Sequence, residues 1–267
     1  MKTKIITNNE STFYDNWANK VNVEDVLVKD IFRATTAPEN REIEKFLGDV
    51  KGKDILEIGC GFGEASVYLA MKGARVTASD ISKIMVNFVK RLAKYNKVEM
   101  EVCQASAEKL PFKDNSFDVV YAANVLHHVD ILATIMEVKR VLKKGGKFVC
   151  WDPLKDNPLI NIYRQKAKSV RTVCEHPLSW SEVQTIQNSF TIAKIRCTWF
   201  FTLWIFVKYF VFDRIDPNKE RYWKKVIYDS KKYKNTYLKL EKIDNIILRL
   251  CPFLQRYCWN VVIMAEK

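Results

Sequence analysis

Asp54-Ile-Leu-Glu-Ile-Gly-Cys-Gly-Phe-Gly63 is the stretch of sequence that decides the fold. Its first half is an apolar run typical of a buried strand, and its second half has a glycine at every other position. A helical pattern begins directly afterwards, near Glu64. A strand, a glycine-rich turn and a helix in this order are typical of doubly wound α/β folds.

The segments around this stretch alternate between strand-like and helix-like patterns. The predicted strands are 54–59, 75–80, 98–105, 117–124 and 147–152, and the predicted helices between them are 63–72, 82–95 and 131–142. Such alternation predicts a parallel sheet with helices on both faces. Two later strands at 190–198 and 257–265 complete the prediction, and helical patches at 23–32 and 39–47 precede it. We therefore expect a Rossmann-like, doubly wound, mostly parallel seven-stranded sheet.

The glycine-rich turn and the second strand indicate which ligand the fold holds. The third glycine of a dinucleotide fingerprint would fall at position 64, where Glu64 would repel a pyrophosphate. Asp80 ends the second strand 21 residues after Gly59, a spacing that suits a carboxylate bound to both ribose hydroxyls. S-adenosylmethionine has a ribose and positive charges but no phosphate, so it tolerates both acids.

Further motifs follow in order along the chain: Ala107-Glu-Lys-Leu-Pro-Phe-Lys-Asp-Asn-Ser-Phe-Asp118, Val125-Leu-His-His-Val129 and Leu142-Lys-Lys-Gly-Gly-Lys147. With the glycine-rich stretch and Asp80, they resemble the class I S-adenosylmethionine-dependent methyltransferases over about residues 50–152. The similarity is greatest to the branch of ubiquinone and menaquinone biosynthesis methyltransferases. The resemblance implies S-adenosyl-L-methionine as cofactor.

The resemblance also assigns roles to individual residues. The assigned residues are Glu57 near the methionine ammonium, Gly59, Gly61 and Gly63 in the loop under the cofactor, Asp80 at the ribose, Ile81 on the adenine, Ala107 and Glu108 at the adenine edge, and Asn124 beside the methyl-transfer centre. Ser106 stands where the family often has an aspartate that contacts the adenine amino group. A hydroxyl can accept that bond, but as a neutral acceptor it binds more weakly.

A general base is needed only where the methyl acceptor is a poor nucleophile, such as a phenol or an acidic carbon. The candidates are His128, after the fourth strand, and His176, after the core. The alternative for His128 is a residue that recurs in the family without a catalytic role. The alternative for His176 is a loop residue fixed by Pro177. We expect no metal in the reaction. Seven cysteines without Cys-x-x-Cys spacing also argue against a zinc ribbon or a disulfide framework.

Residues 199–212 contain eight aromatic side chains, and they open an insertion of unusual composition. As a helix this segment would span roughly 21 Å, short of a hydrocarbon core of about 30 Å. It is therefore predicted to be a substrate lid, an interfacial segment or a dimer contact. Residues 208–256 hold 13 Lys and Arg against six acids. The resulting excess of seven positive charges is more than half of the net charge of +13. Aromatic and basic segments side by side are typical of a peripheral membrane anchor for anionic lipid, and the alternative is a solvated helix with a well-packed lid.

We expect four parts in the chain. Residues 1–52 form N-terminal helices over the active site, and residues 53–198 form the cofactor-binding core. Residues 199–254 form the aromatic and basic insertion, and residues 255–267 form the last strand. The expected activity is methyl transfer to a small hydrophobic acceptor at oxygen, carbon or nitrogen, with Tyr14, Trp17, Tyr163 and Arg171 as acceptor-pocket candidates. The N-terminus lacks the apolar stretch of a signal peptide, so we expect a cytoplasmic protein, peripherally membrane-associated. The alternatives are an RNA or protein methyltransferase that docks through the basic insertion, although no RNA-binding motif is present, and a non-catalytic cofactor-binding scaffold.

Overall fold

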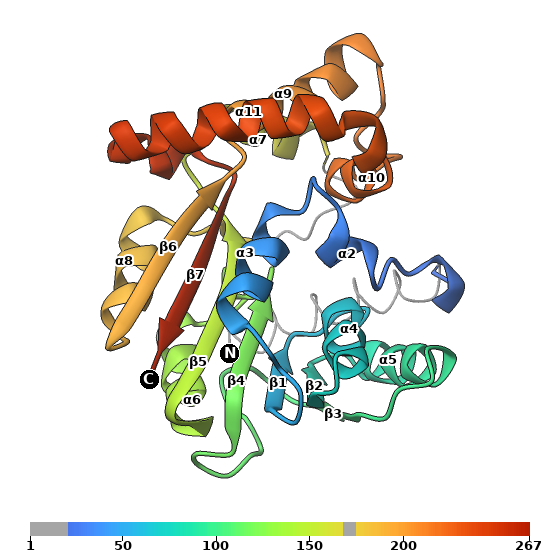
Figure 1. Cartoon of the computed structure of the whole chain (residues 1–267), viewed down its shortest axis with the longest axis vertical. Helices are drawn as coiled ribbons and strands as arrows, with labels where there is room; N and C mark the ends of the chain where they lie inside the picture. The colour runs from blue at the N-terminus through green and yellow to red at the C-terminus, as the bar shows by residue number, and fades with distance from the viewer. Residues whose placement is uncertain (1–20, 168–174) are drawn as a thin grey trace.

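The computed structural model describes residues 21–167 and 175–267 (Figure 1), so the candidates Tyr14, Trp17 and Arg171 lie outside the described residues. Its centre is a seven-stranded sheet of order β3-β2-β1-β4-β5-β7-β6. The strands are β1 (Asp54–Ile58), β2 (Arg75–Asp80), β3 (Glu101–Gln104), β4 (Phe117–Ala123), β5 (Leu142–Pro153), β6 (Ile192–Thr198) and β7 (Asn260–Glu266). Strands β1 to β5 pair in parallel, while β7 lies antiparallel to both β5 and β6. The predicted fold class is confirmed.

Helices cover both faces of the sheet, as the alternating pattern predicts. One face carries α3 (Pro38–Leu47), α4 (Glu64–Met71) and α5 (Lys83–Tyr95), and the other carries α6 (Ile131–Val141) and α8 (Trp180–Asn188). Local chemistry sets where these helices begin. The side chains of Ser82 and Asp130 accept hydrogen bonds from the first turns of α5 and α6, and Ser179 begins α8 with a capping box.

The structure differs from the predicted elements at two places. The predicted helix at 23–32 is wrong: this segment holds only a 3-10 turn, η1 (Val23–Asp25), and a single turn, α2 (Asp30–Arg33). Its valines pack on the core, and Val26 does so from extended backbone directly after the 3-10 turn. A helix would restrict the rotamers of these β-branched side chains. Strand β5 also begins earlier than expected, because Leu142 pairs with Phe117 directly after α6 ends.

The insertion forms a helical cap, which we define as residues 199–257. It contains η4 (Phe201–Leu203), α9 (Trp204–Val207), the π-helix η5 (Lys208–Phe212), α10 (Tyr222–Tyr228), α11 (Ser230–Leu250) and η6 (Pro252–Tyr257). Figure 1 shows α11 lying across the end of the sheet, with α7 (Pro158–Lys166) beneath it. The buried Asp244 of α11 accepts backbone hydrogen bonds from Phe200, Phe201 and Thr202, which fixes the aromatic segment to this helix.

Aromatic rings fill the interior of the helical cap. The buried rings are those of Trp199, Phe206, Tyr209, Tyr222, Tyr233 and Tyr237. They form a core separate from the two cores that flank the sheet, so the cap has its own source of stability. In the part of the chain that the structure describes, no helix combines the length and the apolar character needed to cross a membrane.

Candidate cofactor and acceptor site

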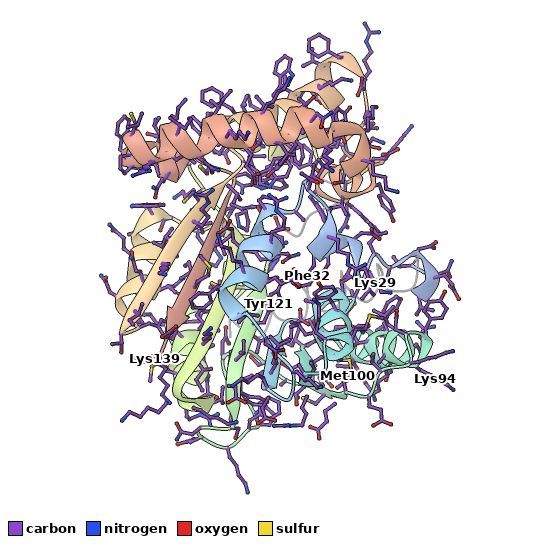
Figure 2. All side chains as sticks on the ribbon, viewed as in Figure 1. Lys29, Phe32, Lys94, Met100, Tyr121 and Lys139 are labelled. Carbon is purple, nitrogen blue, oxygen red and sulfur yellow. The ribbon has the colours of Figure 1, made fainter. Side chains whose placement is uncertain are left out.

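A cavity of ≈ 410 Å³ lies between the carboxyl ends of the central strands and the helical cap. Residues predicted for the site line much of it: Glu57, Gly59, Gly61, Asp80, Ile81, Ser106, Ala107, Glu108, Asn124 and His128. Ligands of open α/β sheets bind at this edge. Tyr121 of β4 stands at its inner wall (labelled in Figure 2), where its hydroxyl donates to Asn40 Oδ1 of α3 at 2.8 Å.

Asp80 connects the second strand to the glycine-rich loop. Its Oδ2 accepts a hydrogen bond from the Gly61 amide at 2.9 Å, and its Oδ1 accepts one from the Ser82 amide at 2.8 Å. Each carboxylate oxygen has two lone-pair sites, so both can accept a further bond from a ribose hydroxyl. The same carboxylate therefore orders the loop and faces the ligand position.

Glu57 is buried at the end of β1, and its carboxylate accepts a hydrogen bond from the Ser66 hydroxyl. Burial, with a smaller contribution from the nearby carboxylates of Glu64 and Asp80, raises the pKa of Glu57 to about 8. An adjacent positive charge would favour the ionised form. A cationic ligand is therefore the natural counterpart of this group.

The charged side chains of the cavity wall also indicate whether the cavity suits a cationic ligand. Six acids line it, Glu39, Glu57, Glu64, Asp80, Glu108 and Glu175, against two arginines, Arg164 and Arg221. Such a wall suits the sulfonium and ammonium of S-adenosylmethionine and disfavours a pyrophosphate. The residues present therefore fit this cofactor.

Two glycines of the loop have different structural roles. Gly61 has a φ of +51°, and a Cβ at this position would meet nothing within 4 Å, so the space above it is open toward the cavity. Gly63 has a φ of +81° and precedes α4, but a Cβ there would lie 2.8 Å from the side chain of Val89. Gly63 does not line the cavity. It permits close packing of the loop on α5.

The adenine end of the predicted site is built from the segment after β3. The Ser106 hydroxyl accepts a hydrogen bond from the Glu108 amide at 3.3 Å, and Glu108 Oε1 accepts one from the Asp130 amide at 2.8 Å. Ala107 is buried between them. These bonds hold the turn against the start of α6, so the edge that Ser106 presents is fixed by local contacts.

The other end of the cavity holds a histidine–aspartate pair that the sequence analysis does not predict. His127 Nδ1 lies 2.6 Å from Asp152 Oδ1, and both side chains are buried. Burial raises the pKa of Asp152 to about 7. Ala123 of β4 pairs with Trp151 of β5, which brings the turn after β4 close to Asp152 near the end of β5. The sequence places the two residues near the ends of neighbouring predicted strands, but it does not give the register that joins them.

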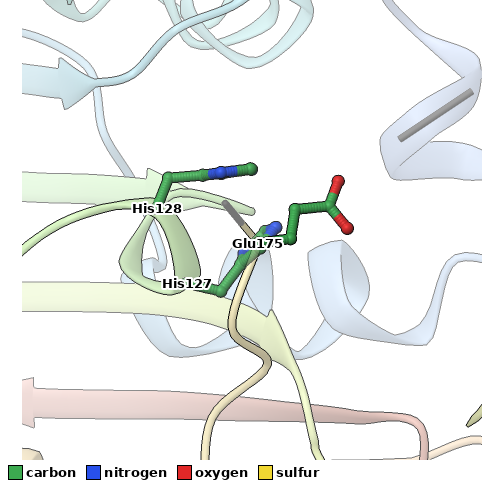
Figure 3. A group of neighbouring side chains, drawn as sticks. All are labelled: His127, His128 and Glu175. Carbon is green, nitrogen blue, oxygen red and sulfur yellow. The ribbon is translucent and has the colours of Figure 1, made fainter. Parts of the chain in front are cut away.

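His128 and Glu175 stand beside this pair. Figure 3 shows the side chains of His127, His128 and Glu175 as neighbours, and their ligand atoms lie within 4.8 Å of one another. Asn124 borders the same region at a φ of +56°, a backbone conformation that non-glycine residues adopt mainly at special sites. His176 differs: it is exposed, does not line the cavity and donates its backbone amide to the His127 carbonyl at 3.0 Å.

Another part of the wall, which also holds Arg164 and Arg221, is rich in apolar and aromatic side chains. These are the side chains of Ile160 and Tyr163 of α7 and of Trp199, Trp223, Ile227 and Trp259. Tyr163 is thus the acceptor-pocket candidate that the structure places in the cavity. The three tryptophans lie far apart in the sequence, so no local pattern could have grouped them.

Comparison with known proteins shows what this part of the chain is similar to. Residues 56–150 match the family described as methyltransferase domain. The predicted resemblance to the class I S-adenosylmethionine-dependent methyltransferases is confirmed, and the methyltransferase domain contains the glycine-rich loop, Asp80 and the histidine pair.

Curated relatives share this domain. A fatty-acid O-methyltransferase of Mycolicibacterium smegmatis is 38% identical over 109 residues, which are 39% of this chain and 38% of that protein. A demethylmenaquinone methyltransferase of Lactococcus lactis is 34% identical over 141 residues, covering 51% of this chain and 52% of that protein. The chain thus spans about half or less of the length of these relatives.

The fold extends beyond the methyltransferase domain. A solved S-adenosylmethionine-dependent methyltransferase of Thermotoga maritima superimposes with a TM-score of 0.58 at 19% identity, over 96% of this chain and 99% of that one. At this identity the likeness shows the fold alone. The whole described architecture is therefore one that occurs in a solved methyltransferase.

Proposed function

We propose that the protein transfers a methyl group from S-adenosyl-L-methionine to a small, lipophilic acceptor at an oxygen, carbon or nitrogen atom. The observation that carries this proposal is the mixed wall of the cavity of the methyltransferase domain. Glu57, Asp80 and the glycine-rich loop form one part of its wall, and Trp199, Trp223 and Trp259 form another part, together with Arg164 and Arg221. A charged, polar cofactor and an apolar acceptor would each meet the part that suits it.

The proposed cofactor residues are the predicted ones: Glu57, Gly59, Gly61, Gly63, Asp80, Ile81, Ser106, Ala107, Glu108 and Asn124. In this proposal Glu57 holds the ammonium of the methionine part and Asp80 holds the ribose. Gly61 leaves room for the ligand, and Gly63 acts through packing.

When bound, S-adenosylmethionine supplies a methyl group activated by its positively charged sulfur. The protein then has to align the acceptor in line with that methyl group and keep water out. Trp199, Trp223 and Trp259 are placed to do this for an apolar acceptor. For an acceptor that must lose a proton, we propose His128 as the base. Its position on the cavity wall favours it over the exposed His176.

We also propose that the helical cap associates peripherally with an anionic membrane surface. Seven aromatic side chains of the cap are exposed, and four of them, Phe201, Trp204, Phe210 and Phe212, lie close together in the sequence. The surrounding residues 208–256 have an excess of seven positive charges (13 basic against six acidic). Lipophilic acceptors partition into membranes, so a membrane contact near the cavity would serve their capture. Salt-sensitive binding of RNA to the same basic surface would instead favour an RNA substrate.

Calorimetric titration of S-adenosylmethionine and S-adenosylhomocysteine into the wild type and the Asp80→Ala variant tests the proposed function. We expect the substitution to weaken binding by about 1–3 kcal/mol, because it removes an acceptor from both the loop and the ribose. Asp114→Ala is the control, since Asp114 is an exposed carboxylate in the loop before β4. Absence of binding by the wild type would overturn the proposal and leave a scaffold on this fold.

A further inference from the structure

Two segments bring three metal-ligand side chains together at the acceptor end of the cavity. His127 and His128 lie in the 3-10 turn η2 (Leu126–His128), and Glu175 lies in the loop before α8. All three line the cavity, and their ligand atoms lie within 4.8 Å of one another (Figure 3).

Both segments are held in place independently of any ligand. The amide of His127 donates to Asp152 Oδ1 at 3.2 Å, which fixes the turn to the end of β5. The amide of His176 donates to the His127 carbonyl at 3.0 Å, which fixes the neighbouring Glu175 beside the turn. The backbone therefore positions the three side chains.

Asp152 orients the buried imidazole. Its Oδ1 lies 2.6 Å from His127 Nδ1, so Nε2 is the nitrogen left to face away from Asp152. A carboxylate bonded to the second nitrogen of a histidine is the usual outer partner of a metal-bound imidazole, where it fixes the tautomer and raises ligand basicity. The pair thus presents His127 Nε2 in the form that a metal requires.

The donor set indicates the class of ion. Two imidazoles and one carboxylate suit zinc, iron, cobalt or nickel, whereas magnesium and calcium prefer oxygen ligands throughout. Three protein ligands also leave a coordination position open, which is the arrangement of catalytic rather than structural sites. Here the open position would lie on the cavity side.

We propose that His127, His128 and Glu175 bind one divalent transition-metal ion, whose open position faces the cavity and takes an oxygen atom of the acceptor, such as a hydroxyl or carboxylate. The site itself stands on the geometry alone, while its role toward the acceptor rests on the proposed function. With the ion bound, His128 acts as a ligand and not as a base. This replaces the expectation of a metal-free reaction.

Titration of Co²⁺ into chelator-treated, tag-free protein tests the site, with visible absorption and equilibrium dialysis as readouts. We expect one Co²⁺ per chain, displaced by Zn²⁺, and at least about tenfold weaker binding in His128→Ala and in Glu175→Gln. Asp152→Asn should weaken binding by about 10–100-fold, the usual effect of removing an outer partner. His176→Ala is the matched control and should bind as the wild type, because the substitution keeps the backbone amide that donates to the His127 carbonyl.

The proposal is overturned if the wild type binds no Co²⁺ or Zn²⁺, or if His128→Ala and Glu175→Gln bind as tightly as the wild type. These two half-buried side chains are chosen because their replacement leaves the buried His127–Asp152 pair intact. A parallel titration with S-adenosylhomocysteine separates the two proposals. Retained cofactor binding without metal binding refutes the metal site alone, and the reverse result refutes the proposed function alone.

Discussion

At the scale of single residues, Glu57 illustrates a binding group that lowers the stability of the unliganded fold. Its pKa in the folded protein is about 8, raised by burial from 4.5. Between these values a rising pH ionises Glu57 in the unfolded chain but not in the folded one. The folded state therefore loses stability from about pH 4.5 to about pH 8, and the loss stays constant above that range.

Glu57→Gln should remove this loss, because its amide is neutral at every pH and can still accept the Ser66 hydrogen bond. Without cofactor, we expect the melting temperature of the variant to exceed that of the wild type by at least about 3 °C at pH 8. The two should converge near pH 4.5, and cofactor affinity of the variant should fall. Thermal unfolding across this pH range measures the difference. A difference that does not change with pH would refute the assignment.

The same scale shows what the sequence could predict about the site. Glu57, Gly61 and Asp80 follow from their places at strand ends, because chain spacing determines them. His127 and Asp152 do not, since their contact depends on the register between β4 and β5. Among the histidines, sequence alone selected His128 and His176 as candidates, whereas the structure places His127 in the buried pair.

At the scale of elements, the loop from β1 to α4 separates ligand binding from packing. Gly61→Ala should cost about 1–2 kcal/mol of stability through its left-handed backbone, and its new methyl group should project into the open cavity side and weaken cofactor binding. Gly63→Ala should destabilise the fold more, by about 2–4 kcal/mol. Its new methyl group overpacks against Val89, and this cost adds to the strain of the left-handed backbone. Urea unfolding and cofactor titration of the pair measure both effects. Equal loss of stability in the two variants would contradict the division of roles.

Element boundaries were predictable where local chemistry sets them. Helices α5 and α6 begin close to the expected residues because Ser82 and Asp130 cap them. The segment at 23–32 misled the prediction, because its apolar spacing resembles a helix while its valines pack on the core from a 3-10 turn and the extended residue Val26. Tertiary packing overrode the pattern there, and no neighbour in the sequence signals it.

At the scale of the whole molecule, the helical cap has two faces with opposite character. Trp199 lines the cavity, and the rings of Phe206 and Tyr209 are buried with it, so the inner face encloses the site. Trp204 and Phe212 are 49% and 64% exposed, and their rings contact each other on the outer face. The sequence predicted the aromatic content but could not divide it between these faces, because the segment changes from 3-10 to α to π-helix within twelve residues.

The outer face supplies a test of membrane association. Wild-type protein should sediment with vesicles that contain phosphatidylglycerol and much less with vesicles of phosphatidylcholine, because the basic residues of the cap require anionic lipid. Replacing both Trp204 and Phe212 by Ser should lower binding at least about tenfold, since burying each ring contributes up to about 1.5–3 kcal/mol. The control is Leu132→Ser with Met136→Ser, two exposed apolar residues of α6. If the Trp204/Phe212 variant binds like the wild type, these rings do not meet the membrane, and sedimentation velocity then decides whether they form a contact between two copies of the chain.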